Sequence, residues 1–174
     1  MKKKLLYNNK VGILGGTFDP PHSGHLHISK IAIKKLKLKS LTWIITKQNP
    51  YKKKPYLSES KRIMLSKKIL IKEKKIFVKL QDNTVKSTST FDLLTYLKKK
   101  NRRLNFYFII GSDNLIQFHK WKNWNKIPDL AKIVVFARSK YILKAFKSVA
   151  AKKLKKKDWI YINAKKVNIS SSLI

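Results

Sequence analysis

Residues 15–26 combine the residue types that could do chemistry on phosphate groups: paired glycines, a threonine, proline and two histidines. The segment follows a short apolar run, residues 11–14, and precedes a stretch in which apolar residues recur at helical spacing. We therefore expect it at the junction of a strand and a helix. Glycines let a backbone approach a phosphate closely, and the amides at the positive end of a helix attract anions. His22 and His25, three residues apart at a helix start, point the same way and can both donate to phosphate oxygens. The pattern predicts a phosphate-binding site.

The same residues also have a purely structural interpretation. One histidine could cap the helix, the other could be a hydrogen-bonded core residue, and Gly15 and Gly16 could only form a turn. A glycine pair alone would favour that interpretation. Because the glycines, threonine, proline and both histidines coincide at one strand-to-helix junction, we favour the functional interpretation.

The rest of the chain alternates between short apolar runs and segments of helical spacing. Strands are predicted at residues 11–14, 41–46, 76–80, 106–110, 133–136 and 159–162. Helices are predicted over residues 24–38, after the capping residue Ser58, after the capping residues 88–90, from Ser112 and Asp113 onward, and over residues 141–154. Two prolines, Pro50 and Pro55, exclude regular structure from residues 48–56 and indicate a basic loop.

This alternation predicts an α/β fold, Rossmann-like and doubly wound, with a mainly parallel sheet and helices on both faces. In such sheets, ligands bind beyond the carboxyl ends of the strands, near the point where the strand order reverses. The segments after Leu14, Thr46 and Ile110 are therefore the candidate site. With 174 residues and no visible linker or internal repeat, we expect one domain that spans residues 1–174.

The net charge of +34 raises the question of a nucleic-acid partner. Lysines occur in every segment, and only four of the 42 basic residues are arginine. Charge that is spread in this way is more often a solvated surface, and we favour that interpretation over a dedicated RNA or DNA site. In either case, polyanions such as ATP should be attracted at low salt and less so as salt rises.

Other features of the composition indicate a soluble cytoplasmic protein. No apolar run approaches the roughly 18 residues that a membrane-spanning helix needs, and the N-terminal segment lacks the apolar region of a secretory signal. The absence of cysteine excludes a disulfide framework and a thiolate metal site, and it fits a reducing compartment.

Residues 15–26 resemble the GGTFDPxHxGHL signature of the nucleotidyltransferase superfamily, in which His22-Ser23-Gly24-His25 corresponds to the (H/T)xGH motif. Residues 111–115, followed by Trp121 and Trp124, resemble the G-(A/S)-D-N-L…W segment of bacterial nicotinate-nucleotide adenylyltransferase. Residues 48–50 and the lysines after them resemble the basic substrate loop of that family, and residues 168–174 resemble the start of its ISSTxIR motif.

The resemblance implies an enzyme that makes nicotinate adenine dinucleotide and pyrophosphate from ATP and nicotinate mononucleotide, with Mg²⁺ accompanying ATP and no metal held by the protein itself. The mononucleotide phosphate attacks the α-phosphorus in line, so the protein contributes positioning and charge stabilisation. The catalytic residues would be His22 and His25. The ATP-binding residues would be these two histidines with Gly15, Gly16, Thr17, Phe18, Gly111, Asp113, Ser170 and Ser171.

The resemblance also implies a site for the mononucleotide. Its residues would be Thr17, Phe18, Lys52, Thr90, Asp113 and Trp121. The indole of Trp121 offers a flat face for the pyridine ring, and Asp113 can accept from ribose hydroxyls. For Trp121 alone, core packing is the alternative, and we assign Trp124 and Trp159 to the core.

Two positions depart from the family pattern. Where the family commonly has a Tyr-Thr pair before a helix, this chain has Ser89-Thr90. The ISSTxIR match stops at Ile174, so the final arginine of that motif has no counterpart in the sequence given, and a guanidinium there would grip ATP phosphates bidentately.

Several alternatives stay open at this point. The acceptor could differ, as in pantetheine-phosphate adenylyltransferase or a cytidylyltransferase of the same superfamily. From other classes, the chain could be a basic RNA-binding protein on this scaffold, or a sensor that binds the dinucleotide without making it. The sequence decides neither the oligomeric state nor the choice between nicotinate and nicotinamide mononucleotide.

Overall fold

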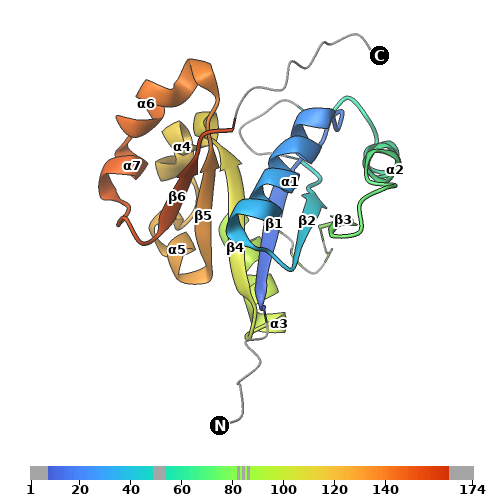
Figure 1. The fold of residues 1–174 in the computed structure, drawn as a ribbon, viewed down its shortest axis with the longest axis horizontal. Coiled ribbons are helices and arrows are strands. Elements are labelled where there is room, and N and C mark those ends of the chain that lie inside the picture. Colours follow the sequence, from blue (N-terminus) through green and yellow to red (C-terminus); the bar gives the residue numbers. More distant parts are fainter. Residues whose placement is uncertain (1–7, 49–53, 82, 84, 86, 165–174) are drawn as a thin grey trace.

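A single six-stranded sheet organises the molecule in the computed structural model, which describes residues 8–48, 54–81, 83, 85 and 87–164 (Figure 1). All pairings between neighbouring strands are parallel, in the order β3-β2-β1-β4-β5-β6. The strands are β1 (Lys10–Gly16), β2 (Ser40–Ile45), β3 (Ile76–Leu80), β4 (Asn105–Gly111), β5 (Ala131–Phe136) and β6 (Trp159–Ile162). The α/β fold predicted from the sequence is confirmed.

Helices connect the strands. The α-helices are α1 (Ser23–Leu36), α2 (Glu59–Ile69), α3 (Thr90–Lys100), α4 (Ser112–Gln117), α5 (Ile127–Leu130), α6 (Ile142–Phe146) and α7 (Val149–Lys153). There are also three short 3₁₀ helices among the described residues, η1 (Phe118–Lys120), η2 (Trp124–Lys126) and η3 (Ser139–Tyr141). The prediction of one helix over residues 141–154 is wrong: the segment forms α6 and α7, because Ser148 caps a new helix by accepting from the amide of Ala151.

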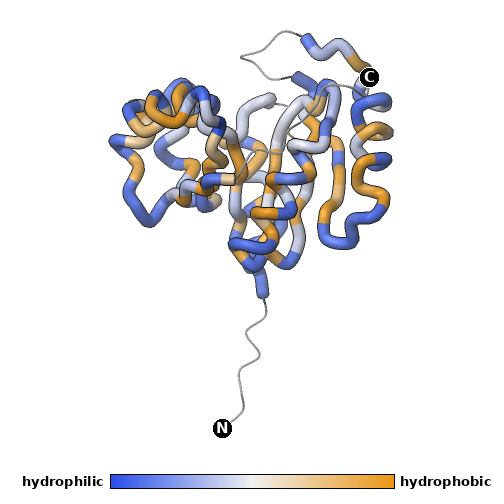
Figure 2. The backbone as a smooth tube through the Cα atoms, turned by 45° about the horizontal axis from the view of Figure 1, so that its top comes forward, coloured by the Kyte–Doolittle hydropathy of each residue, from blue (hydrophilic) through white to orange (hydrophobic). Residues whose placement is uncertain are grey.

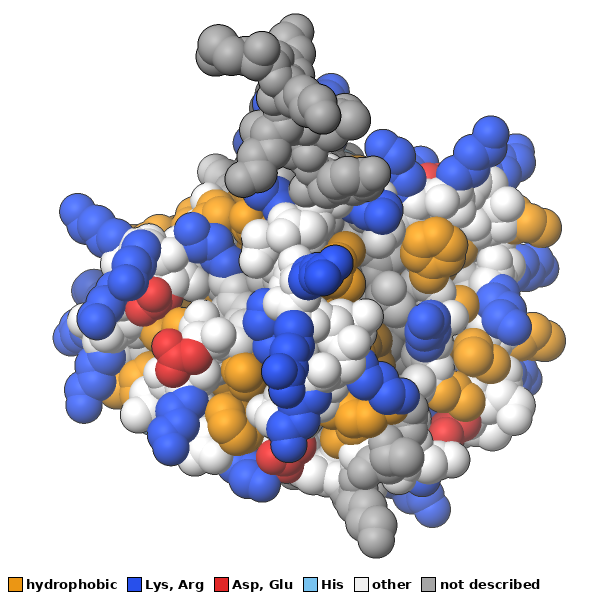
Figure 3. Space-filling view, turned by 90° about the horizontal axis from the view of Figure 1, so that it is seen from below, with side chains coloured by type: hydrophobic (Ala, Val, Ile, Leu, Met, Phe, Trp, Pro, Cys, Tyr) orange, Lys and Arg blue, Asp and Glu red, His pale blue; other side chains and the backbone are white. Residues whose placement is uncertain are grey.

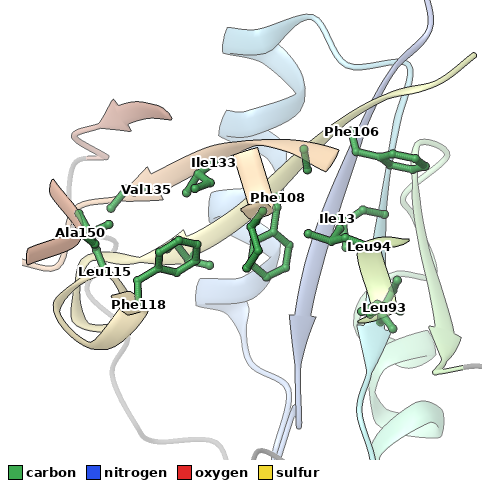
Figure 4. Packing of buried hydrophobic residues seen from close by; sticks show 14 of the residues in the cluster. Ile13, Leu93, Leu94, Phe106, Phe108, Leu115, Phe118, Ile133, Val135 and Ala150 are labelled. Carbon is green, nitrogen blue, oxygen red and sulfur yellow. The ribbon is translucent and has the colours of Figure 1, made fainter. Parts of the chain in front are cut away.

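Two hydrophobic clusters cover the two faces of the sheet. The first joins the sheet to α3, α4, α5, α6 and α7 and includes Phe106, Phe108 and Phe118 (Figure 4). The second joins the opposite face to α1 and α2 and includes Trp43, which is fully buried. Figure 2 shows hydrophobic segments running along the strands at the centre of the fold, as expected for strands covered on both faces.

The strand order indicates where in the sheet a ligand would bind. β2 and β3 extend from β1 in one direction, and β4, β5 and β6 extend in the other, so the order reverses between β1 and β4. Ligands of such sheets bind in the crevice at the carboxyl ends of these two strands. Gly16 ends β1 and Gly111 ends β4, so the segments predicted to form the site meet there.

Basic side chains are distributed over the surface. On the face at the amino ends of the strands, Lys and Arg are interspersed with hydrophobic and uncharged residues, and few acidic side chains are present (Figure 3). Within residues 8–164 as described, no helix is both long and apolar enough to cross a membrane.

Candidate active site

A cavity of about 800 Å³ opens at the carboxyl ends of β1 and β4. Nine of the sequence-predicted site residues line it: Gly15, Gly16, Thr17, Phe18, His22, His25, Thr90, Gly111 and Trp121. Its walls come from the loop and helix after β1, the end of β2, the start of α3, the end of β4, and the segment after β5. Residues far apart in sequence therefore meet around one space of ligand size.

The two histidines are oriented by main-chain amides of their own turn. His22 is the N-cap of α1, and its Nδ1 accepts from the amide of Gly24 at 3.2 Å. Nδ1 of His25 accepts from the amide of His22 at 3.3 Å. A neutral imidazole that accepts through Nδ1 carries its proton on Nε2, so each ring presents a donor at that atom. The capping role considered in the sequence analysis is thus real for His22, and the accepting Nδ1 atoms leave the N–H of each neutral ring on Nε2.

A stack of rings supports this pair. The ring centroids of His22 and His25 lie 3.9 Å apart, and the ring of Phe18 lies 4.8 Å from that of His25. Phe18 in turn stacks on Trp43 of β2 at 5.0 Å. Phe18 has a positive φ of 50°, an unusual conformation for a bulky side chain, and is only 3% exposed. Its side chain therefore supports His25 from the core, while its position after β1 keeps it at the edge of the cavity.

A hydrogen-bonded chain ties the first turn of α1 to the sheet. The indole N–H of Trp43 donates to the hydroxyl of Ser29 at 2.8 Å, and Ser29 donates to the carbonyl of His25 at 2.7 Å. Both Trp43 and Ser29 are fully buried. Buried, satisfied polar contacts of this kind fix a single arrangement, so the helix start that carries His25 is held in place.

The charge environment keeps His22 neutral. Desolvation by the surrounding protein and, second, the positive charge of Arg138 lower the pKa of His22 below its ordinary value of 6.5. Near pH 7 the imidazole is therefore a neutral donor through Nε2.

A buried arginine organises the two loops beside the histidines. Arg62 of α2 is 2% exposed, and its guanidinium donates to the carbonyls of Thr17 at 2.7 Å and Thr46 at 2.8 Å. It also donates to the carbonyls of Leu57 and Lys47. Four of its five N–H donors are thereby used to hold the segments that follow β1 and β2.

Asp19 makes a second tie between the same loops. Its carboxylate accepts from the main-chain amides of Tyr56 and Leu57, 37 and 38 residues further along the chain. The loop after β2, in which the sequence analysis placed substrate-binding lysines, is thus anchored at its far end to the loop that carries the histidines.

The end of β4 has no room for a side chain. A Cβ added to Gly111 would lie 2.3 Å from Oδ1 of Asp113 and 3.0 Å from Nε of Arg138. Nη1 of Arg138 donates to Oδ2 of Asp113 at 3.1 Å, while Oδ1 of Asp113 is buried and has no hydrogen-bond partner among the described residues. Asp113 therefore lies beside the cavity, engaged by Arg138, and does not line it.

The cavity wall opposite the histidines carries an aromatic face and a helix start. Trp121 is half-buried, with its ring 5.0 Å from that of Phe118. Ser89 is the N-cap of α3 and accepts from the amide of Asp92, and Thr90 is the first residue of that helix. Because Trp121 both packs on the core and lines the cavity, its core role and its proposed ligand role are compatible.

The remaining predicted site residues, Lys52, Ser170 and Ser171, lie outside the described residues. Three features were missed in the sequence analysis: Arg62, the pair Ser29 and Trp43, and Arg138. The available signal was the rarity of arginine in a lysine-rich chain, together with the position of Arg138 two residues after the end of the fifth predicted strand.

Comparisons with known proteins identify the family of this chain. A family model described as cytidylyltransferase-like matches residues 13–174. A relative from Pelagibacter ubique (strain HTCC1062), named "probable nicotinate-nucleotide adenylyltransferase", is 49% identical over 94% of this chain and 90% of its own length. A relative of the same name from Ruegeria sp. (strain TM1040) is 38% identical over 74% of this chain and 67% of its own length.

A solved structure shares the fold. A Plasmodium falciparum nicotinic acid mononucleotide adenylyltransferase complexed with NaAD matches with a TM-score of 0.70 and 23% identity, covering 91% of this chain and 77% of that one. With this fold, the histidine pair at the carboxyl end of β1 and these relatives, the chain belongs to the cytidylyltransferase-like family and, within it, to the nicotinate-nucleotide adenylyltransferases.

Proposed function

We propose that this protein transfers the AMP part of ATP to nicotinate mononucleotide, giving nicotinate adenine dinucleotide and pyrophosphate. The observation that carries the proposal is the pair of imidazoles, His22 and His25, presented by main-chain hydrogen bonds to a glycine-lined cavity. The names of the relatives from Pelagibacter ubique and Ruegeria supply the choice of acceptor.

The reaction needs no covalent intermediate on the protein. An oxygen of the mononucleotide phosphate attacks the α-phosphorus of ATP, the bond from that phosphorus to the α,β-bridging oxygen breaks, and pyrophosphate leaves with the electron pair. The protein holds the reactants in line and stabilises the negative charge that develops on the phosphates. In this proposal His22 and His25 donate from Nε2 to phosphate oxygens, and the absence of side chains at Gly15 and Gly16 lets the phosphates approach the backbone.

The opposite wall of the cavity would receive the mononucleotide. The half-buried indole of Trp121 offers a face for the pyridine ring, and the start of α3 at Thr90 lies on the same wall. Asp113 lies beside the cavity and does not line it, so its contact with a ribose hydroxyl stays a proposal that rests on the resemblance. Lys52, Ser170 and Ser171 complete the proposed contacts on the basis of the resemblance alone.

We propose that Mg²⁺ arrives on the phosphates of ATP, where it neutralises part of their charge. Mg²⁺ takes oxygen ligands, and nucleotide sites commonly hold it through phosphates with one or two carboxylates. Of the carboxylates near the cavity, Asp19 accepts from two amides and Asp113 pairs with Arg138. In the part of the chain that the structure describes, no three His, Cys, Asp or Glu side chains are grouped to hold a metal.

We propose that residues 1–174 form one nucleotidyltransferase domain that acts in the cytoplasm. Both hydrophobic clusters pack against the same sheet, which favours a single folding unit. A chain without cysteine needs no oxidising compartment.

The test is an assay of pyrophosphate release with purified protein, ATP, Mg²⁺ and nicotinate mononucleotide. Nicotinamide mononucleotide and 4′-phosphopantetheine are run in parallel, and CTP replaces ATP in a further arm. We expect release with nicotinate mononucleotide and ATP, its loss with EDTA, and an unchanged Tm in EDTA because the metal comes with the nucleotide. No release from folded protein, or faster release with another acceptor, would refute the assignment.

A further inference from the structure

Arg138, the second residue after β5, is a cation at the cavity whose hydrogen-bond donors are mostly not used within the described structure. Arg138 lines the cavity, and its side chain is 56% exposed. Among the described residues its guanidinium makes one hydrogen bond, from Nη1 to Asp113. An arginine has five N–H donors, so four have no partner among the residues that the structure describes.

Arg62 provides the contrast within the same molecule. Its guanidinium is buried, and four of its five donors are bonded to main-chain carbonyls. Arg62 is therefore a structural cation, whereas Arg138 faces the space where a ligand would bind. The exposed ion pair of Arg138 with Asp113 is of the weak kind, so an anionic ligand can recruit the guanidinium.

The backbone of Arg138 is fixed even though its side chain is exposed. Its amide donates to the hydroxyl of Ser112 at 2.9 Å, and Ser112 is fully buried at the start of α4. Its Nε lies close to the position that a Cβ on Gly111 would occupy. The end of β4 and the start of α4 together hold the guanidinium stem against the edge of the cavity.

The position of Arg138 relative to the histidines suits an extended anion. His22 lies in the segment after β1 and Arg138 in the segment after β5, and β4 separates these two strands, whose axes are therefore two strand spacings, about 10 Å, apart. Gly15, Gly16 and Gly111 leave the strand ends between them free of side chains. Desolvation and, second, the charge of Arg138 lower the pKa of His22, which is consistent with a cation near the same cavity.

We propose that Arg138 is a phosphate-binding residue of this active site, which donates guanidinium N–H groups to the polyphosphate of ATP from the segment after β5. This inference rests on the proposed function in one respect, that the ligand of the cavity is a nucleoside triphosphate. Guanidinium groups suit phosphate because their planar donors match its oxygens in pairs.

The experiment compares Arg138→Gln and Arg138→Lys with a matched control, Arg102→Gln. Arg102 is an exposed arginine in the turn before β4, at the opposite end of the sheet, so the control removes the same charge away from the cavity. Binding of ATP and of adenosine is measured by calorimetry, and KM for ATP and for nicotinate mononucleotide by pyrophosphate release.

We expect Arg138→Gln to weaken ATP binding and raise KM for ATP by roughly tenfold to a hundredfold, with adenosine affinity and Tm unchanged. Arg138→Lys should recover part of the loss, and Arg102→Gln should match the wild type. Equal ATP affinity in Arg138→Gln and Arg102→Gln would overturn the inference, as would an equal loss for adenosine. The calorimetric measurement of ATP binding needs no acceptor nucleotide. If the wild type binds ATP tightly but does not turn it over, the proposed reaction is refuted and the role of Arg138 is still tested. If the wild type does not bind ATP, the proposed reaction and the role of Arg138 are both refuted.

Discussion

The main-chain amide of His22 donates to Nδ1 of His25, while Nδ1 of His22 accepts from the amide two residues further on. The two rings lie 3.9 Å apart as a result. Capping the helix and binding an anion are therefore not alternatives for these residues. The Nδ1 atoms accept from amides of the helix start, and in the proposed reaction the Nε2 atoms donate to the phosphates.

Removal of the imidazole at position 25 should stop catalysis without unfolding the protein. His25→Ala should lower kcat by roughly 10² to 10³, because it deletes one donor to the charge that develops on the phosphates. His25→Asn separates the two roles, since its side-chain oxygen can still accept from the amide of His22 while the Nε2 donor is lost. We expect Asn to preserve Tm and to be as inactive as Ala. Wild-type kcat in His25→Asn would exclude His25 from the reaction.

The stability of the protein should depend on pH through His22. Its pKa in the fold is lowered, by desolvation and then by Arg138, so the unfolded chain binds the proton more tightly. Its contribution to the free energy of unfolding is therefore full above pH 6.5 and is lost as the pH falls through the lower folded pKa. Urea unfolding of wild type and His22→Asn at pH 7.5 and 5.5 checks this, because Asn still caps the helix but does not titrate. Identical pH dependence in the two proteins would contradict the prediction.

Two glycines of β1 should respond differently to alanine. A Cβ at Gly12 would lie 2.9 Å from Leu38 and 3.0 Å from Leu41, so Gly12→Ala should lower the free energy of unfolding by about 1 to 3 kcal/mol. A Cβ at Gly15 would make only an ordinary contact, 3.6 Å from Phe108, so Gly15→Ala should fold normally and raise KM for ATP. Urea unfolding and ATP kinetics on both variants measure this. The prediction fails if Gly15→Ala destabilises the fold more than Gly12→Ala.

Arg62 should matter for both the fold and the geometry of the site. Arg62→Met would leave the carbonyls that it now holds, including those of Thr17 and Thr46, without their donor in a buried place. We expect a loss of on the order of 3 kcal/mol in the free energy of unfolding and a lower kcat. Lys67→Met, an exposed change on the same helix, is the control and should leave both quantities unchanged. A tolerated Arg62→Met would show that the loops keep their form by other contacts.

The strands could be predicted because buried parallel strands are short continuous apolar runs. The run at residues 76–80 coincides with β3, and residues 106–110 lie within β4. Helical spacing was less informative after β5, where the apolar periodicity of residues 141–154 gave no sign that Ser148 would start a second helix. Periodicity shows which face is buried, but it does not show where a hydroxyl competes for the backbone.

The histidines could be predicted because their spacing and capping are local to one turn. The residues that hold the site together could not, because their partners are distant in sequence. Arg62 bonds to Thr17 across 45 residues, and Arg138 bonds to Asp113 across 25. Such contacts depend on the strand order, which local patterns of hydrophobicity do not specify.

The capping geometry of α1 has a consequence for how this sequence can change. The imidazoles take their direction from backbone groups, which are present whatever amino acids surround them. Exposed lysines away from the cavity can thus change without removing the hydrogen bonds that orient the two rings. Because these hydrogen bonds lie within the first turn of α1, exposed lysines elsewhere on the surface can be exchanged to improve solubility or crystallisation.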